Sequence, residues 1–490
     1  MPEVPPPTPE PLAAPAPDPR AAAAAWYLRS AHRRLWMLPL TAGLVVVVAL
    51  LLLRGTAEDP AENLKASQAA LLALAPPAVP KEENAAEDYA LAQKAKVPYS
   101  SSAALGSPRN DPSTFITKES RLFENPDVQA YVAKNAAAIQ HLYAGAAKAR
   151  CNWGLNYGLG INMLMPHLAQ TRDSARLLAI HARASAHAGD HRAAARSIAT
   201  IYKLAQHVNS DPVLISSLVC IACASIADGT IEAIVAWDTP DSSEDLAAYR
   251  KAVWLDRHWQ TAAARSLACE RAMNLYTLDG MASGSMPMPG FPGFWAGGFL
   301  WYGSDRHCYS AVMDEFIARS LRGEWHKDED MSELIARHQT GPAIMTRMVL
   351  PVLARFGQSL MVCEERGRVV DAGLAFLQFR AKYQRDARSL DELVPEFLAA
   401  VPKGVLSPVP LRMRVDPKGV EEIDRLTQKR SWRDPNTIRI YALGPNGKDD
   451  GGHNNQWGAP DSGGYPDADD TVFRVPPLKK SAAAPGGKAP

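Results

Sequence analysis

Apolar residues recur at spacings of three and four over most of the chain between residues 116 and 350. In the stretch 128–149 the apolar stripe consists of Val128, Tyr131, Val132, Ala136, Ile139 and Leu142. This spacing places about one such side chain per turn on one face, as in an amphipathic helix. Strand-like alternation is missing from this region. We therefore predict an α-helical domain over 116–350, preceded by a linker over 55–115 with a further helical stretch near 61–95.

Residues that typically begin or end helices divide this region. Gly189 follows a long periodic stretch and is expected at a helix C-terminus, and residues 242–245 are expected at a helix N-terminus. The two stretches that flank Gly189, from His181 to His207, resemble one tetratricopeptide-type hairpin. The resemblance covers a single repeat and no fixed period recurs, so we interpret the region as an array of helices.

The pattern changes after residue 355. Residues 355–386 predict one long helix, and residues 389–392 predict a capping box at the start of the next element. Three short stretches have the composition of strands, at residues 411–415, 438–443 and 471–475. A long helix with a small antiparallel sheet is therefore expected over 355–476, followed by a disordered tail over 477–490. The predicted fold class is α+β multidomain.

Nineteen residues without a charge, 35–53, follow a start of the chain in which residues 1–20 contain nine prolines. A helix of that length spans roughly 28 Å, close to the hydrocarbon core of a bilayer. Arginines precede the run, which places the N-terminus in the cytoplasm and the bulk of the chain outside it. We predict a disordered tail over 1–34 and a single transmembrane helix over 35–54 in the cytoplasmic membrane. A cleaved signal peptide is the alternative, but its apolar core is usually shorter.

Composition narrows the function classes. The chain has 53 Lys and Arg against 52 Asp and Glu, without the basic excess expected of a protein that binds nucleic acid. Six cysteines in 490 residues are too few for a disulfide scaffold. Cys220 and Cys223 lie in an apolar helical stretch, which favours buried thiols over the alternative of a redox pair. Without a second pair nearby, a zinc site is not expected there.

The charges are unevenly distributed, and the loop between the last two predicted strands is strongly acidic. From Asn446 to Asp470 it contains six aspartates and one lysine. Carboxylates this close together repel one another, and calcium, which takes about 6–8 oxygen ligands, would relieve the repulsion. His453 is the only histidine in the loop and no cysteine is present, so calcium fits better than zinc. The spacing is not that of an EF-hand, and a solvated acidic loop is the alternative.

The order of motifs in residues 360–475 resembles the globular domain of the type II secretion major pseudopilins, as found appended to the helical regions of bacterial membrane-anchored proteins. The long helix leads to SLDELVP, and YALGPNGKDDGG is followed by DADD. The resemblance implies a calcium-binding loop. Its ligands would be the Leu443 carbonyl, Asn446, Asp469 and Asp470, to which we add Asp450 and Asp467 because of their charge and reach.

Four departures limit what the resemblance carries over. Asn446 stands where the family has an aspartate, which removes a charge from the loop. The family's DPWG turn is replaced by residues 402–411, and residues 454–465 lengthen the loop. The apolar run ends at residue 53, far from the module, and lacks a pilin-type signal. The fold and the calcium loop are therefore expected, but not assembly into a fibre.

Two further features suggest binding or catalysis. Residues 280–305 combine Gly and Pro with Met, Phe, Trp and Tyr, which predicts a loop without a regular helix. This loop either folds back over the helical core or forms a flap of a peptide-binding helical array. An extracytoplasmic enzyme would have its site near His167, His181, His187 and Asp190. Common motifs of hydrolases, zinc proteases and nucleotide-binding enzymes are missing from the sequence.

These features lead to an expected function. The chain is predicted to be a membrane-anchored, extracytoplasmic binding or scaffold protein whose pseudopilin-like domain is stabilised by structural calcium. Its expected partners are the membrane, through a single span, and other envelope proteins, with a secretion apparatus as one candidate. An extracytoplasmic enzyme with a site in the helical domain is the alternative.

Overall fold

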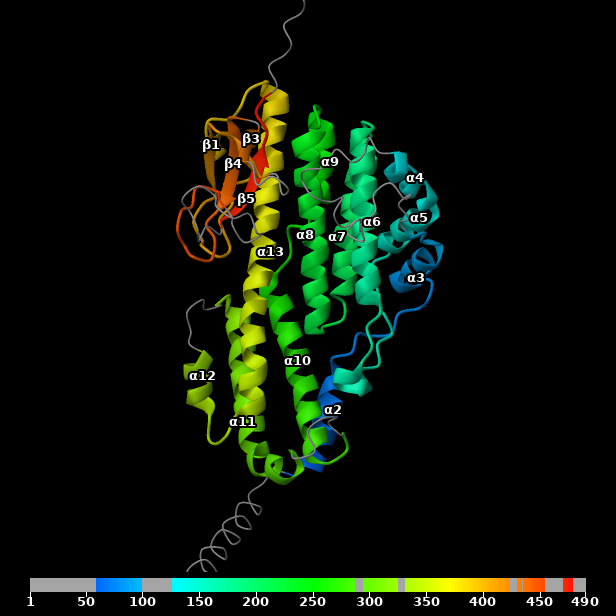
Figure 1. Ribbon diagram of the computed structural model, residues 1–490, viewed down its shortest axis with the longest axis vertical. Coiled ribbons are helices and arrows are strands. Elements are labelled where there is room, and N and C mark those ends of the chain that lie inside the picture. The colour runs from blue at the N-terminus through cyan, green and yellow to red at the C-terminus, as the bar shows by residue number, and fades with distance from the viewer. Residues whose placement is uncertain are drawn as a thin grey trace, which may run out of the picture. The chain divides into compact units, whose positions relative to one another are not determined.

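The computed structural model describes residues 59–98, 126–286, 294–324, 331–423, 430–433, 435–453 and 470–478. The predicted N-terminal tail and membrane helix lie outside these residues, as do residues 287–293 of the predicted flap, the segment 454–469 and the end of the chain. From Pro60 onward the chain forms one compact unit. This unit is mostly helical and contains a small antiparallel sheet near the C-terminus (Figure 1).

The described helices are α2 (Pro60–Ala73), α3 (Ala85–Ala95), α4 (Pro126–Lys134), α5 (Ala136–Ala147), α6 (His167–His187), α7 (His191–Val208), α8 (Leu214–Trp237), α9 (Ser243–Ala252), α10 (Trp259–Ala282), α11 (Phe294–Arg322), α12 (Met331–His338) and α13 (Ile344–Tyr383), with 3-10 turns η3 (Tyr157–Asn162) and η4 (Leu390–Leu393). The strands are β1 (Arg412–Asp416), β2 (Val420–Ile423), β3 (Arg430–Arg433), β4 (Thr437–Ala442) and β5 (Thr471–Val475). The three predicted strands are confirmed as β1, β4 and β5.

The helices α6, α7 and α8 lie side by side (Figure 1). The turn between α6 and α7 is made by Gly189, whose positive φ of 82° suits a residue without a Cβ. Asp190 then begins α7, because its side chain accepts a hydrogen bond from the Ala193 amide at 2.9 Å. Ser242 begins α9 in the same way, through the Asp245 amide at 3.0 Å. Both predicted helix boundaries are thereby confirmed.

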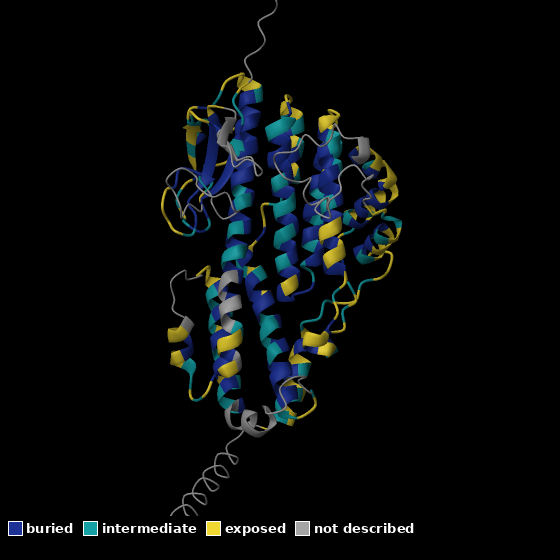
Figure 2. Cartoon of the chain, in the orientation of Figure 1, coloured by how far each residue is buried: buried dark blue, intermediate teal, exposed yellow. Residues whose placement is uncertain are grey.

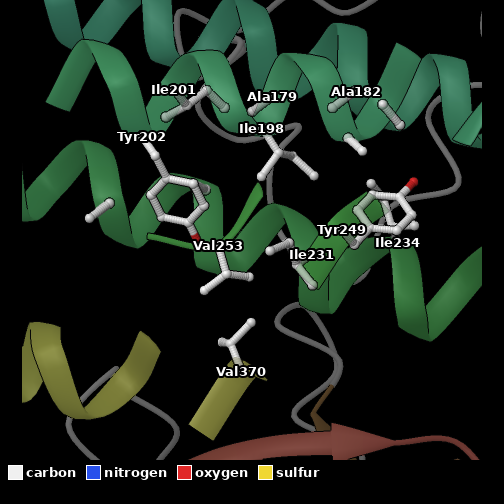
Figure 3. Packing of buried hydrophobic residues seen from close by; sticks show 14 of the residues in the cluster. Ala179, Ala182, Ile198, Ile201, Tyr202, Ile231, Ile234, Tyr249, Val253 and Val370 are labelled. Carbon is white, nitrogen blue, oxygen red and sulfur yellow. The ribbon is translucent and has the colours of Figure 1, made fainter. Parts of the chain in front are cut away.

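The centre of these helices is a core of aliphatic and aromatic side chains. Figure 3 shows α6 contributing Ala179 and Ala182 opposite Ile198 and Ile201 of α7. The same core continues through α8 and α9 into α13 and the strands β4 and β5. Figure 2 shows the buried residues on the faces that the helices turn toward one another. Continuous apolar contact therefore joins the helical region to the C-terminal sheet.

The helix α13 links the two ends of this unit. Its 40 residues give a length of about 60 Å. The part around Leu353 and Phe356 packs with α10 and α11, and the part from Val369 to Phe379 packs with the central core and the sheet. The boundary that we expect between two domains, at 350–355, lies inside this continuous helix.

The sheet has the order β1-β4-β5 and is antiparallel throughout. Ile440 pairs with Met413 on one side and with Phe473 on the other. Phe473 is completely buried and lies against Gly373 of α13, where a Cβ would be only 2.1 Å from the ring. A glycine in α13 therefore permits the close approach of β5.

Two bidentate ion pairs join elements of this unit, one of them between α9 and α13. Arg250 of α9 donates two hydrogen bonds to Asp371, at 2.8 and 3.0 Å, and a third to the Phe397 carbonyl at 2.7 Å. Arg257 donates to both oxygens of Asp228 of α8, at 3.0 and 2.8 Å. Such bidentate pairs set the relative position of the elements that carry them.

Three predictions from the sequence are revised or refined by the structure, and one pair of strands was not predicted. The stretch near 61–95 is helical as predicted, but α2 packs against α10 and α3 against α5, so these residues belong to the compact unit. Residues 294–305 form the start of α11, which corrects the prediction of a loop over all of 280–305. Residues 389–392 lead only into η4, and the Ser389 hydroxyl does not cap it. The hairpin β2–β3 was not predicted.

Within the described residues, α8 is the one helix long and apolar enough to cross a membrane by length and composition. However, 67% of its most apolar window is buried inside the protein. Cys220 and Cys223 of this helix are both free and buried, and burial raises the pKa of Cys223 to about 12. These facts favour a core helix with packed thiols over a redox pair.

Candidate functional site

The predicted calcium ligands lie where β4 ends and β5 begins. Leu443 directly follows β4, and Asp470 directly precedes β5. Because these strands are antiparallel neighbours, both residues lie at the same end of the sheet. Asn446 and Asp450 belong to the loop that leaves β4 there. Asp467 and Asp469 lie outside the described residues.

The Asp470 carboxylate organises this loop. Its Oδ1 accepts a hydrogen bond from the Gly444 amide at 3.1 Å, and its Oδ2 accepts from the amides of Asp450 and Gly452 at 3.0 Å each. The side chain is completely buried. Burial raises the pKa of Asp470 to about 6, and repulsion from Asp450 acts in the same direction, although the amide donors lower it.

Asn446 and Asp450 contact each other directly. The Asn446 side-chain NH2 donates to Asp450 Oδ2 at 2.8 Å, and its Oδ1 accepts from the Lys448 amide at 2.7 Å. Asp450 is 7% exposed, so its charge is poorly solvated. Two buried carboxylates, Asp450 and Asp470, therefore share one small loop.

Sequence reasoning missed the role of Asp449. Its carboxylate accepts from the Tyr441 hydroxyl at 3.0 Å and from the Gly451 amide at 3.0 Å, and it pairs with Arg412. These contacts tie the loop to β4 and β1. Asp449 lies in the sequence between Tyr441 of β4 and the pair Gly451 and Gly452, and this position could have indicated its role. Counting the charges of the loop did not distinguish Asp449 from the other aspartates.

The described donors fit a hard cation in part. Two adjacent buried carboxylates create an excess of negative charge of the kind that a calcium ion would neutralise, and the Leu443 carbonyl and Asn446 amide would be its neutral oxygen ligands. Among the residues that the structure describes, no three His, Cys, Asp or Glu side chains are placed to hold one metal ion. A full coordination shell therefore needs backbone or amide oxygens, or the aspartates that lie outside the described residues.

The four residues of the alternative site are spread along the helical region. His167 and His187 are the first and last residues of the 21-residue helix α6, about 30 Å apart. His187 contacts Asp238 at 3.0 Å, while His181 contacts the Ser197 hydroxyl at 2.8 Å. Asp190 caps α7. The structure does not bring these side chains to one centre.

His167 has a different and more enclosed environment. Its Nε2 lies 3.8 Å from Asp211 Oδ2, and neither atom has a hydrogen-bond partner among the described residues. Asp211 is completely buried and accepts a hydrogen bond from the Tyr157 hydroxyl at 3.1 Å. Burial lowers the pKa of His167 to about 4 and raises that of Asp211 to about 6.

We compared the chain with models of protein families, with curated proteins and with solved structures. No family model, curated protein or solved structure matches it. The pseudopilin resemblance of the C-terminal module accordingly stays a prediction from its motifs.

Proposed function

We propose that this chain is a membrane-anchored binding or scaffold protein of the cell envelope, with its bulk outside the cytoplasm. Its C-terminal module is proposed to be pseudopilin-like and stabilised by a structural calcium ion. The observation that carries the proposal is the described part of the loop after β4, residues 444–452, which folds around the buried Asp470 carboxylate with Asp450 beside it. The continuous core from α6 to β5 suits a rigid scaffold.

The residues proposed to hold calcium are the Leu443 carbonyl, Asn446, Asp450 and Asp470, together with Asp467 and Asp469. The ion would supply positive charge between carboxylates that otherwise repel one another. Asp470 has a second role, because it accepts three backbone hydrogen bonds that shape the loop. No catalytic role is proposed for these residues.

Thermal unfolding of the full chain in lipid nanodiscs, with calcium or with chelator, tests this proposal. An ion that binds only the folded state at about 100 times its Kd adds roughly 2.7 kcal/mol, which corresponds to a rise in Tm of about 3–5 °C. Asp450→Asn should remove most of this rise, since it removes a charge but keeps the oxygen that Asn446 contacts. Asp241→Asn, at an exposed position outside the loop, should keep it. Equal Tm values with and without calcium would refute the calcium site.

A further inference from the structure

A cavity of about 890 Å3 lies between α3, the segment that connects α5 to α6, and the first turns of α6. Its walls come from residues 78–93, 152–167 and 170–174, with Leu204 of α7. A cavity of this size is in the range of sites that bind small molecules. It is distinct from the C-terminal loop, so an inference about it does not depend on calcium binding.

One wall is a stack of three aromatic rings. Trp153 lies between Tyr89 and His167, with ring centroids 5.6 and 4.6 Å away and interplanar angles of 18° and 20°. The indole NH donates to the His207 carbonyl at 2.9 Å, and the Tyr89 hydroxyl contacts His207 Nδ1 at 2.7 Å. His167 Nε2 is turned toward Asp211. Both faces of Trp153 are covered, and the indole NH and the Tyr89 hydroxyl are engaged within the protein.

Asn84 and Gln93, in the other walls, are also hydrogen-bonded within the protein. Asn84 Oδ1 accepts from the Asn152 amide at 2.9 Å, and Asn84 Nδ2 donates to the Asn152 carbonyl at 2.9 Å. Gln93 donates to the Ser174 hydroxyl at 2.8 Å. A peptide ligand would bring N–H and C=O groups that need partners when they are buried. The side chains of Asn84 and Gln93 already have partners within the protein, which disfavours a peptide that would rely on them.

A further part of the lining is apolar and reaches the surface. Leu155, Met163 and Pro166 line the cavity, and Leu159 and Leu164 line it while being 47% and 82% exposed. Exposed leucines beside a concave apolar wall are typical of a site that binds an apolar ligand. A hydrocarbon chain suits this wall, because such a chain has no polar groups that would need hydrogen-bond partners.

The charges in the lining are few. Lys81 and Glu87 are both exposed and are the charged side chains that line the cavity. Their charges are opposite, so the lining carries no net charge from these two side chains. Lys81 supplies a counter-charge for the carboxylate or phosphate that adjoins an acyl chain.

We propose that this cavity binds the acyl chain of a fatty acid or of a membrane lipid. The chain would lie against the leucines and the aromatic stack, and the anionic headgroup would lie near Lys81. Acyl-chain binding is additional to the proposed scaffold function. It assigns a ligand to the helical region, separate from the calcium ion proposed for the C-terminal loop. The free acid and the membrane lipid share the chemistry that the cavity recognises.

Photo-crosslinking of the full chain in lipid nanodiscs tests the proposal. One arm uses a free fatty acid with a diazirine in its chain, and the other uses phosphatidylglycerol with the same group in one acyl chain. Mass spectrometry locates the crosslinks. We expect them in residues 78–93 and 152–174, and the arm that yields them identifies the source of the chain.

Two variants make the test specific. Leu164→Glu puts a charge into the apolar lining at an exposed position, and we expect crosslinking to fall at least tenfold. Ala90→Trp fills the cavity from the exposed side of α3 and should do the same. Leu321→Glu on α11 and Leu91→Trp on α3 are matched controls at exposed positions that do not line the cavity, and they should crosslink like the unaltered chain.

Several results would overturn the acyl-chain site. Crosslinks absent from the cavity segments in both arms would do so. Equal crosslinking of Leu164→Glu, Ala90→Trp and their controls would also do so. Displacement of the probe by an apolar peptide, but not by unlabelled fatty acid, would assign the cavity to a peptide instead.

Discussion

At the scale of single residues, the pair His167 and Asp211 is buried without a matching hydrogen bond. Their facing atoms are 3.8 Å apart, and one oxygen of Asp211 is held by the Tyr157 hydroxyl. Burial disfavours the charged form of each group, which is why the pKa of the histidine falls to about 4 and that of the aspartate rises to about 6. At neutral pH the structure therefore contains a neutral histidine beside a poorly solvated carboxylate.

Asp211→Asn should stabilise the protein at pH 8. The pKa of Asp211 is raised from 3.8 to about 6 on folding, so its contribution is favourable below pH 3.8 and is lost as pH rises through 6. The asparagine keeps the acceptor for Tyr157 and has no charge. We expect a gain of up to about 3 kcal/mol at pH 8, since one pKa unit corresponds to about 1.4 kcal/mol. The gain should shrink toward zero by pH 4.

Urea unfolding of both chains across this pH range measures the effect. Asp190→Asn, at the exposed N-cap of α7, serves as the comparison, because it makes the same chemical change at a position that is not buried. A gain for Asp211→Asn that is equal at pH 4 and pH 8 would contradict the assigned cause. His167 acts in the opposite direction, since its lowered pKa removes stability as pH falls from 6.5 toward 4.

These two residues also show what the sequence can and cannot predict about sites. The acidic loop was predicted because its charges are close together in sequence, and Asn446 and Asp450 are indeed in contact. His167 and Asp211 are separated by 43 intervening residues and meet only through the packing of helices. The site of His167, His181, His187 and Asp190 was assembled from sequence proximity, and the length of α6 separates His167 from His187.

At the scale of elements, the sheet approaches α13 closely at Gly373. A Cβ there would lie 2.1 Å from Phe473 Cδ1, and Phe473 is completely buried. Glycine weakens a helix interior by about 1 kcal/mol relative to alanine. Its presence in the middle of α13 is explained by the space that the β5 phenylalanine needs.

Gly373→Ala should destabilise the protein by about 1–3 kcal/mol, because the overlap with Phe473 outweighs the gain in helix propensity. Gly229→Ala is the matched control, since a Cβ at Gly229 of α8 meets nothing within 4 Å. That variant should be neutral or up to about 1 kcal/mol more stable. Urea unfolding measures both, and a stabilising effect at both positions would show that β5 does not lie this close to α13.

The elements differ in how well local pattern predicted them. β4 and β5 were predicted because β-branched and aromatic residues are concentrated in them, and both are buried. Residues 294–305 were expected to be a loop because of their glycines, yet α11 begins at Phe294 and packs along α10. The prolines of the predicted loop 280–305 all precede α11. Packing along α10 offsets the low helix propensity of the glycines in α11. Residues 389–392 had a helix-start signal, but only a 3-10 turn follows.

At the scale of the whole molecule, the described helical region and the sheet share one core. The apolar cluster runs from α3 through α6 and α8 to β5. Arg250 adds a polar connection, because it donates to Asp371 and Gln378 of α13 and to the Phe397 carbonyl. From the sequence we expected a boundary between two domains at 350–355, where the pattern of apolar residues changes. Such a change indicates secondary structure, but it does not indicate which surfaces become buried against each other.

This shared core predicts that the helical region and the sheet unfold together. Arg250→Met should remove about 3–5 kcal/mol, because it leaves the buried Asp371 carboxylate without its partner. Hydrogen exchange of the full chain should then show equal losses of protection in α7 and in β4. Arg192→Met is the control, since the pair of Arg192 with Glu244 is highly exposed and should contribute little.

The distribution of lost hydrogen-exchange protection between α7 and β4 distinguishes one cooperative unit from two independent domains. In a single unit, the free energy of opening is the same for the slowest amides of α7 and β4, and a mutation at their common contact lowers both equally. In two independent domains, Arg250→Met would reduce protection mainly in β4 and β5, and α7 would keep its original value. Equal losses would mean that a ligand which stabilises either the C-terminal loop or the cavity beside α6 also stabilises the other site, because both ligands would draw on the same folding equilibrium.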